Sequence, residues 1–183
     1  MFCNRLIFYD LETTGLKDTD NIIEIGAKDN KGNTFEKLIN PECELPNFIE
    51  NLTGIKQNKL LYRHTILQAK KQINEWFDFG NKDIYLIAHN GDSFDIKFLL
   101  KTFDIKCKQI DTLKLFKKLI PNQQSHSIKS LCNLYNIDCS KHHRALEDVI
   151  ILEQLFYKAI ELYKIIFNKK KINIEDIYNY IYN

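Results

Sequence analysis

The sequence predicts an α/β protein in which a mixed five-stranded sheet is flanked by helices. Two apolar strand patterns are joined by the turn sequence Asn30–Asn33, which indicates an antiparallel hairpin near the beginning of the chain. The continuous apolar run Ile84–Ala88 is typical of a strand that is covered on both faces, and helical periodicity follows it. Three antiparallel strands followed by two parallel strands account for both observations.

Each element has its own signal in the sequence. Hydrophobic runs bounded by turn residues predict strands at residues 6–9, 21–29, 34–39, 84–88 and 108–111. A 3.6-residue apolar period and capping residues predict a short helix within 47–58 that ends at Gly54, and further helices at 65–79, 94–103, 113–119, 127–135, 144–167 and 174–182. Ser93 is the expected N-cap of the helix at 94–103.

Length and composition limit the possible classes of protein. The chain has 183 residues, 27% of them charged, and a net charge of +2, which is ordinary for one globular domain. We expect a domain over residues 1–168 and a tail over 169–183, a short helix packed on the same domain. No apolar run is long enough for a membrane span and no signal peptide is evident, so we expect a soluble intracellular protein, cytoplasmic or nuclear. The five scattered cysteines indicate neither a disulfide framework nor a zinc site.

The most informative stretch follows the first predicted strand. Asp10 and Glu12 are two residues apart at its end, where the two-residue period of a strand directs both carboxylates to one face. Such a pair repels itself and loses hydration unless a cation neutralises it. Oxygen ligands of this kind suit Mg²⁺ or Mn²⁺, so the pair predicts part of a metal site. The alternative is a polar strand end that begins a solvated turn.

A second polar cluster follows the strand at 84–88. A right-handed crossover would place the end of this strand beside Asp10 and Glu12. Asp95, in the first turn of the next helix, could then point toward the metal site. Asp92 is the rival candidate from the same turn, and its alternative role is to cap the helix.

Two further residues of this cluster have both a functional and a structural interpretation. Asn90 could donate an amide hydrogen bond to a phosphate or a carboxylate, or it could serve as a turn residue. His89 is interpreted chiefly as a histidine packed at the end of the strand, and it remains a candidate for substrate contact.

A third cluster precedes and begins the last long helix. Asp148 falls on or beside the inward face of that helix, where an acid is costly to bury without a partner. His143 lies just before the helix, from where its imidazole could reach the site. A histidine with an unperturbed pKa near 6.5 is suited to take a proton from water at neutral pH. The sequence therefore offers a general base next to a group of acids.

With these clusters in hand, the sequence resembles the DEDD superfamily of 3′-5′ exonucleases, which has a ribonuclease H-like fold. Within it, the closest likeness is to the DnaQ-like (DEDDh) branch, whose third motif carries a histidine. Asp10–Leu16 reads Asp-Leu-Glu-Thr-Thr-Gly-Leu and matches the first motif of the family. Ala88–Asp95 matches the second, in which the aspartate after the aromatic residue is the ligand, and this favours Asp95 over Asp92.

The third motif and the spacing of the second refine the resemblance. The family places a histidine five positions before the last aspartate, and this spacing selects His143 over His142. The number of residues between His89 and Asp95 in the second motif most resembles that of the three-prime repair exonucleases. The sequence also resembles the epsilon proofreading subunits of polymerase III, in which this motif usually has one residue fewer. The likeness covers nearly the whole chain, from about Arg5 to Phe167.

The resemblance implies a reaction and a set of catalytic groups. Asp10, Glu12, Asp95 and Asp148 are the implied ligands of two Mg²⁺ ions, or of Mn²⁺ in their place, with His143 as the general base. The implied reaction is phosphodiester hydrolysis at the 3′ end of single-stranded nucleic acid, DNA being favoured, with release of nucleoside 5′-monophosphates. An end of this kind can be unstacked to reach the metal ions.

The resemblance also implies contacts to the last nucleotide. Thr53 and Ile55 resemble a loop that contacts it, and Leu16 is either a contact to its base or an ordinary core residue. The expected substrate-binding residues are Leu11, Thr13, Thr14, Leu16, Thr53, Ile55, His89 and Asn90.

Two alternatives remain at the level of the sequence. An RNA 3′-end trimming enzyme would use the same acids and histidine, because discrimination depends on how the site treats a 2′-hydroxyl group. A non-catalytic module that binds nucleic acid or a polymerase is the alternative from another class, and such a module would be expected to have lost at least one acid. Any proofreading role would require a polymerase supplied in trans. The sequence leaves the oligomeric state open.

Overall fold

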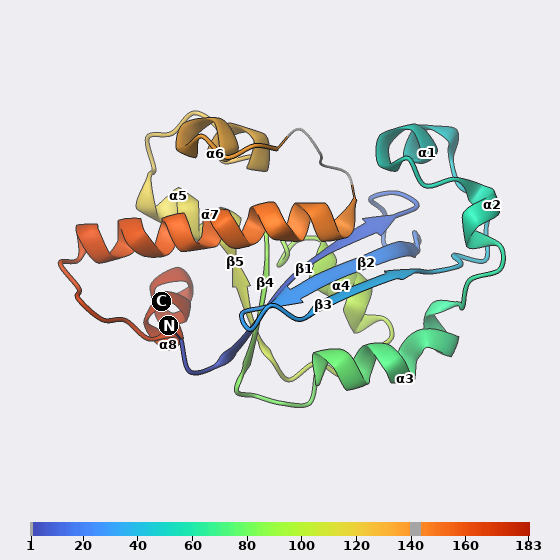
Figure 1. Ribbon diagram of the computed structural model, residues 1–183, viewed down its shortest axis with the longest axis horizontal. Coiled ribbons are helices and arrows are strands. Elements are labelled where there is room, and N and C mark those ends of the chain that lie inside the picture. Colours follow the sequence, from blue (N-terminus) through green and yellow to red (C-terminus); the bar gives the residue numbers. More distant parts are fainter. Residues whose placement is uncertain (1, 140–143) are drawn as a thin grey trace.

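A five-stranded mixed sheet forms the centre of the molecule, and helices cover both of its faces (Figure 1). The computed structural model describes residues 2–139 and 144–183. The strand order is β3-β2-β1-β4-β5, with bounds Arg5–Thr13 (β1), Ile22–Asp29 (β2), Thr34–Leu38 (β3), Ile84–Ala88 (β4) and Lys108–Asp111 (β5). The first three strands are antiparallel, and β4 and β5 run parallel to β1. The predicted sheet is confirmed.

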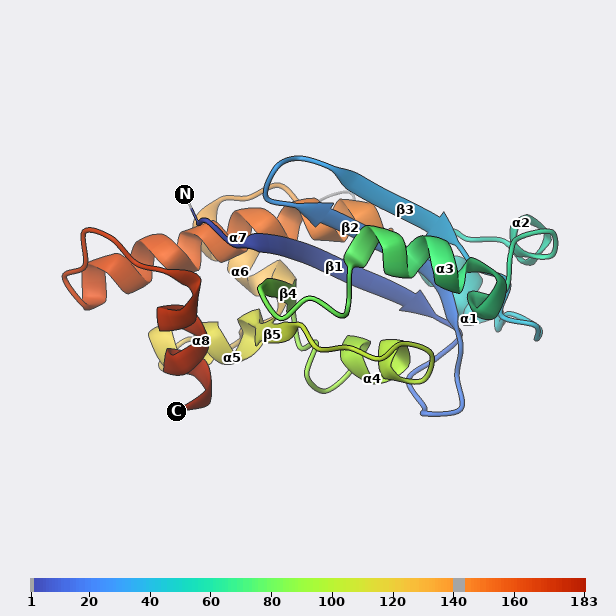
Figure 2. The same ribbon diagram turned by 90° about the horizontal axis from the view of Figure 1, so that it is seen from below.

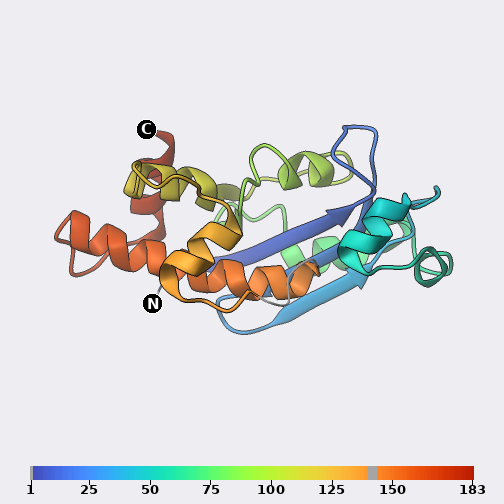
Figure 3. The same cartoon turned by 90° about the horizontal axis from the view of Figure 1, so that it is seen from above.

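The helices divide between the two faces of this sheet. Their bounds are Asn47–Thr53 (α1), Gln57–Leu60 (α2), Ile66–Phe77 (α3), Asp95–Leu100 (α4), Thr112–Leu119 (α5), Ile128–Tyr135 (α6), Ala145–Ile166 (α7) and Ile174–Tyr182 (α8). The long helix α7 crosses one face together with α5 and α6, whereas α3 and α4 lie on the other (Figures 2 and 3). Within the described residues, no helix combines the length and the apolar sequence needed to cross a bilayer.

Alternation along β1 gives the protein two hydrophobic clusters and places the acids. Leu6 and Phe8 pack under α5, α6 and α7, whereas Ile7 packs under α3 and α4. Fully burying a side chain of this size contributes about 1.5–3 kcal/mol, so these positions fix which face of the strand is which. Because Asp10 and Glu12 continue the even-numbered series, their side chains emerge on the face that carries α7.

Three details differ from the expectation. Strand β1 continues to Thr13, because its pairing with β2 extends through Glu12, so the two acids lie within the strand rather than after its end. Helix α4 is shorter than predicted, and Ser93 is not its N-cap, because Phe94 occupies that position without a side-chain hydrogen bond. Helix α1 ends at Gly54 in the left-handed conformation, as expected, but the chain then forms the additional short helix α2.

Candidate active site

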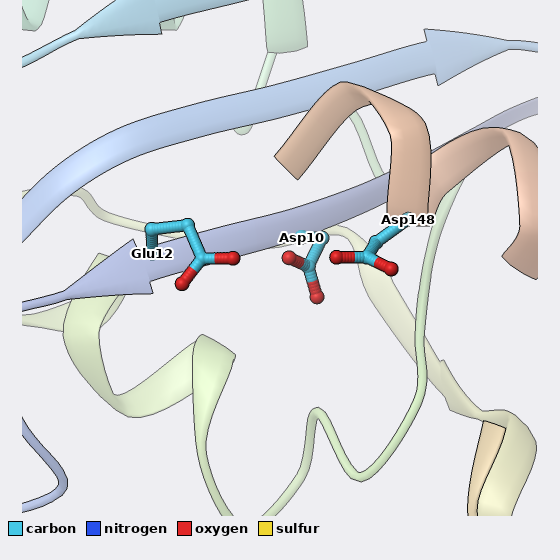
Figure 4. A group of neighbouring side chains, drawn as sticks. All are labelled: Asp10, Glu12 and Asp148. Atoms are coloured by element: carbon cyan, nitrogen blue, oxygen red, sulfur yellow. The ribbon is translucent and has the colours of Figure 1, made fainter. Parts of the chain in front are cut away.

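Three carboxylates meet where β1 passes under the first turn of α7. Asp10 and Glu12 from β1 and Asp148 from α7 each offer an oxygen, and these oxygens lie within 4.8 Å of one another. Figure 4 shows the three side chains turned toward a common point. The structure thus brings together acids that are far apart in the sequence.

The absence of a side chain at Gly26 allows α7 to approach the sheet so closely. Gly26 lies on β2 directly opposite Asp10. A Cβ atom at position 26 would lie 2.3 Å from the backbone carbon of Ala145 and 2.4 Å from the backbone nitrogen of Leu146. The first turn of α7 therefore contacts the backbone of β2 directly, and this contact places Asp148 close to Asp10.

A buried carboxylate on β2 fixes the beginning of the same helix. Glu24 is fully buried, and it is the residue of β2 that lies directly opposite Glu12 of β1. It accepts hydrogen bonds from Nη2 of Arg144 at 2.6 Å and from the backbone N–H of Ala145 at 3.0 Å. An anion at this place also interacts favourably with the positive end of the helix dipole. Arg144 is therefore held by Glu24 and, at 3.0 Å, by Glu36.

The carboxylates of the cluster strongly disfavour one another's ionisation. Burial raises the pKa of Asp10 well above its usual range, and the charges of Asp95 and Asp148 raise it further. Burial, together with the nearby Asp148 and Glu24, raises the pKa of Glu12 to about 8. Such shifts are expected for like charges that share a site with little counter-charge. The cluster is a place where added positive charge would be stabilising.

Asp95 is the first residue of α4, which follows β4. Its side chain is 3% exposed, and its Oδ1 atom has no hydrogen-bond partner within the described residues. Burial raises the pKa of Asp95 to about 7, although the backbone N–H groups of Asp95 itself and of Leu11 partly oppose the change. Asp95 is not one of the three clustered residues, yet its charge is the largest electrostatic influence on Asp10 after burial.

This arrangement fits a divalent cation bound by oxygen atoms. Oxygen-rich sites of several carboxylates suit Mg²⁺ and Mn²⁺. The clustered oxygens of Asp10, Glu12 and Asp148 provide the negative charge, and the orphaned Oδ1 of Asp95 is a buried polar atom that lacks a partner in the protein. A buried polar atom of this kind is costly unless something satisfies it.

His89 and Asn90 are the two residues that follow β4, and His89 contacts Thr112, which follows β5. His89 Nδ1 lies 2.9 Å from the Thr112 hydroxyl, and burial lowers the pKa of His89 to about 4, so the ring is uncharged at neutral pH. Asn90 has a positive φ of 64° and an exposed side chain. His89 also lines the cleft over the acids, whereas Asn90 does not, and their roles in substrate binding stay predictions.

The other predicted substrate contacts differ in their exposure. Leu16 is 84% exposed, so the alternative of a core residue is excluded and a contact to a base remains. Thr13 and Thr14 are buried, and their hydroxyls bond to the backbone oxygen of Gly15 and to Asp20. Leu11 is buried as well and lines the cleft over the acids.

The side chains of Thr53 and Ile55 make contacts within the protein. The Thr53 hydroxyl donates to the backbone oxygen of Ile49 and accepts the N–H of Ile55. The side chain of Ile55 packs in a small hydrophobic cluster under α1 and α2. A contact to the last nucleotide through these residues stays a prediction.

The cleft above the acids, of about 410 Å³, is also lined by residues that the sequence patterns did not indicate. Ser127, Ile128 and Lys129 at the beginning of α6 contribute to it, as does Cys139. No local pattern identifies these residues, because only the packing of α6 against α7 brings them here. His143, the predicted general base, lies outside the described residues.

Comparison with known sequences agrees with this geometry. The family profile RNase_T, described as Exonuclease, matches residues 7–156. A protein of Staphylococcus epidermidis named 3′-5′ exonuclease DinG is 34% identical over 167 residues, which cover 85% of this chain and 18% of that relative. A DinG protein of Staphylococcus aureus matches to the same extent. The chain thus spans about a fifth of the length of the curated relatives that it matches.

Solved structures share the fold at low sequence identity. Exonuclease X, in a complex with 5′ overhanging duplex DNA, has a TM-score of 0.68 and 23% identity, and the match covers 86% of this chain and 90% of that one. A zinc-bound complex of E. coli ExoI with single-stranded DNA has a TM-score of 0.73 and 16% identity, covering 90% of this chain and 43% of that one. These similarities confirm the ribonuclease H-like fold of the family.

The profile match extends over the acids of all three motifs. It begins at residue 7, before Asp10, and ends at residue 156, after Asp148. It therefore confirms the predicted enzyme class together with the coarser part of the resemblance. The chain belongs to the RNase_T family of exonucleases.

Proposed function

We propose that this chain is a metal-dependent exonuclease that removes nucleotides from the 3′ end of single-stranded nucleic acid, with DNA as the favoured polymer. The products are nucleoside 5′-monophosphates. The catalytic domain is proposed to extend over residues 1–168, with residues 169–183 as a tail packed on it. A non-catalytic binding module would not need to retain a full set of acids, and all four are present here.

The observation that carries the proposal is the convergence of carboxylates. Asp10, Glu12 and Asp148 lie within 4.8 Å of one another, and the pKa values of Asp10 and Glu12 are raised by burial and by a repulsion that a cation would relieve. These three residues and Asp95 would hold two Mg²⁺ ions, with Mn²⁺ able to replace them. The bound ions would supply positive charge that stabilises the charge developing on the phosphate and makes water more acidic.

The remaining steps are assigned to the protein's own groups. His143 is proposed to take the proton from the attacking water, on the basis of its position five residues before Asp148. Burial lowers the pKa of His89 to about 4, which makes this histidine too weak a base for the role. Lys129 lines the cleft, so its ammonium group is placed to contact a phosphate. Leu16, exposed after β1, is proposed to pack on the terminal base.

Single-stranded DNA is proposed as the substrate on two grounds. The cleft must admit a nucleotide whose phosphate reaches acids at its floor, which requires an unstacked end. The related structures named above contain single-stranded DNA or duplex DNA with a 5′ overhang. A finer kinship with the three-prime repair exonucleases rests on the spacing from His89 to Asp95 alone.

Degradation of end-labelled oligonucleotides tests the proposal. Single-stranded DNA and RNA of equal sequence, labelled at the 5′ end, are incubated with the protein in Mg²⁺, Mn²⁺ or EDTA. We expect stepwise shortening that depends on the metal, is faster for DNA and is lost in Asp10→Ala and His143→Ala. Asp18→Asn is the matched control, because Asp18 is an exposed carboxylate in the turn that follows β1 and is not part of the cluster.

The possible outcomes separate the alternatives. Faster shortening of RNA than of DNA would assign the same chemistry to the other polymer. If the wild-type protein shortens neither polymer but binds both in EDTA, the proposed activity is wrong and the non-catalytic module is correct. Equal loss of activity in Asp18→Asn and Asp10→Ala would contradict the assignment of the cluster.

A further inference from the structure

The loop between β4 and α4 leads directly to Asp95, and backbone hydrogen bonds from Phe94 to Asn90 and from Ile96 to Gly91 give it the shape of a turn. Phe94, at the N-cap position of α4, makes no side-chain capping bond. Asn90 within the loop has a positive φ of 64°, a conformation that needs support from its surroundings. These backbone hydrogen bonds set the shape of the loop, whereas its position relative to the sheet depends on the groups that hold it from outside.

Asp111, at the end of β5, holds the inner side of the loop. It is 1% exposed, and its carboxylate accepts the backbone N–H of Asn90 at 3.0 Å and that of Asp92 at 3.3 Å. The same carboxylate caps α5 by accepting the N–H of Leu113 at 2.9 Å. One buried group thus ties the loop to the sheet.

Tyr182 holds the outer side of the loop. Its hydroxyl donates to Oδ2 of Asp92 at 2.7 Å and accepts the backbone N–H of Asp111 at 3.3 Å. Lys114 also donates to Asp92, at 2.6 Å. Burial and the neighbouring Asp92 raise the pKa of Tyr182, so the hydroxyl keeps the proton that it donates. Tyr182 belongs to α8, which lies beyond residue 156, where the family match ends.

Helix α8 is anchored at its other end too, so Tyr182 has little freedom to move away. Glu175, in the first turn of α8, receives a hydrogen bond of 2.6 Å from Lys108 at the start of β5 and another from the Tyr85 hydroxyl. Tyr182, near the last turn, meets the end of β5. The helix packs against both β5 and α5, beside which it lies in Figure 2. It therefore follows β5 from its beginning to its end.

We infer that Tyr182 is a positioning residue for Asp95. By holding the Asp92 carboxylate, Tyr182 fixes the loop that leads to Asp95 and so strengthens the binding of divalent cations at the acidic cluster. The inference rests on the proposed function, since it concerns the same metal site, and it gives the C-terminal helix a part in that function. Partners that orient a metal ligand commonly change metal affinity when they are lost.

Removal of the Tyr182 hydroxyl tests the inference through metal binding. Tyr182→Phe keeps the ring but removes the bond to Asp92. Binding of Mn²⁺ is measured by the electron paramagnetic resonance signal of the free ion. We expect Mn²⁺ to bind about 3- to 10-fold more weakly, and the Mg²⁺ concentration for half-maximal degradation to rise by a similar factor. The KM for the oligonucleotide, measured at saturating Mg²⁺, should not change.

Tyr180→Phe is the matched control. The Tyr180 hydroxyl donates to the backbone oxygen of Lys118 at 3.1 Å, on the same helix but not at the loop. Each variant loses a tyrosine hydroxyl, which makes two hydrogen bonds at Tyr182 and one at Tyr180, so an effect of general loosening of α8 would appear in both. Only Tyr182→Phe is expected to weaken Mn²⁺ binding.

A double variant tests the route through Asp92. If Tyr182 acts through Asp92, then Asp92→Asn combined with Tyr182→Phe should weaken Mn²⁺ binding no more than the stronger single change. Equal Mn²⁺ affinity in Tyr182→Phe, Tyr180→Phe and the wild type would overturn the inference while leaving the proposed function intact. A wild-type protein that neither binds Mn²⁺ nor degrades an oligonucleotide would overturn both.

Discussion

The neighbouring strands β1 and β2 each carry two acids, and the surroundings of the two pairs differ: Glu24 and Asp29 of β2 are buried, whereas Asp10 and Glu12 of β1 are half-buried at the cleft. On β2, Glu24 is bonded by Arg144 and by a backbone N–H, and Asp29 receives bonds from Arg5 and Asn33. Burial alone would raise the pKa of Asp29, but the hydrogen bonds from Asn33, Lys31 and Arg5 lower it below its usual value. These acids are neutralised within the protein.

The acids of β1 lack such partners. Among the described residues, no hydrogen bond or ion pair reaches the carboxylate of Asp10 or that of Glu12, and both pKa values are raised. Glu12 and Glu24 are direct neighbours across the strands, so the difference does not come from location in the fold. It comes from the donors supplied at each place. Acids that receive hydrogen bonds from the protein stabilise the fold. Acids that receive none require a bound cation to neutralise their charge.

The largest expected effect concerns activity. Asp10→Asn should lower the rate of nucleotide release about 10³-fold or more, because it removes a charged ligand from the site. The same change removes like-charge repulsion, so the metal-free protein should be at least as stable as the wild type. Single-turnover rates and thermal unfolding in EDTA measure the two effects. If the variant is active and less stable than the wild type, Asp10 has a structural role, as the acids of β2 have.

The next prediction concerns the close contact between Gly26 of β2 and the backbone of α7. Gly26→Ala should lower the free energy of unfolding by about 1–3 kcal/mol, because the new Cβ meets backbone atoms of α7 that cannot rotate away. The displaced helix carries Asp148, so the Mg²⁺ requirement should rise as well. Gly80→Ala is the control, since a Cβ at that position meets no atom within 4 Å. Equal denaturant midpoints for the two variants would contradict the role of Gly26.

The acid of β2 that anchors α7 should affect stability more than chemistry. Glu24→Gln is expected to cost about 1–2 kcal/mol of unfolding free energy, because the amide keeps one acceptor but loses the charge that pairs with the partly exposed Arg144. Glu36→Gln is the control and should cost less than about 0.5 kcal/mol, because this carboxylate pairs with the same arginine at the surface. Denaturant unfolding measures both. A greater loss for Glu36→Gln would reverse the assignment.

The smallest expected effect is a pH dependence with a definite sign. The folded-state pKa values of Glu12, about 8, and Asp95, about 7, exceed the ordinary values of 4.5 and 3.8. The folded protein therefore binds more protons than the unfolded chain between about pH 4 and pH 8, and the metal-free protein should lose stability as the pH rises through this range. Stabilisation by Mg²⁺ should grow over the same range, because binding must release these protons.

Thermal unfolding with Mg²⁺ and with EDTA, at several pH values, measures this dependence. We expect a difference in Tm of about 2 °C at pH 8.5 and a smaller one at pH 5. In Asp10→Asn the difference should shrink at every pH. A Tm difference that is constant from pH 5 to pH 8.5 would show that the pKa values of Glu12 and Asp95 are not raised.

Much of the fold could be predicted because its signals are local. The alternation of Leu6 and Phe8 with Ile7, the apolar run of β4 and the helical period of α7 each follow from neighbours in sequence. The capping of α4 by Ser93 was wrong, since Asp111 and Tyr182 hold that loop from elsewhere in the chain. Helix α2 was missed because it is one turn long.

By itself, the sequence determined which residues could be ligands. The two-residue period of β1 puts Asp10 and Glu12 on one face, and motif spacing marks Asp95 and Asp148. Only the tertiary structure decided that Asp148 reaches the acids of β1, through the bare backbone at Gly26. The packing of distant elements likewise brought the beginning of α6 and Tyr182 of α8 to the site and its loop. The physical reason is that periodicity is a property of adjacent residues, whereas these contacts depend on the shape of the packed chain.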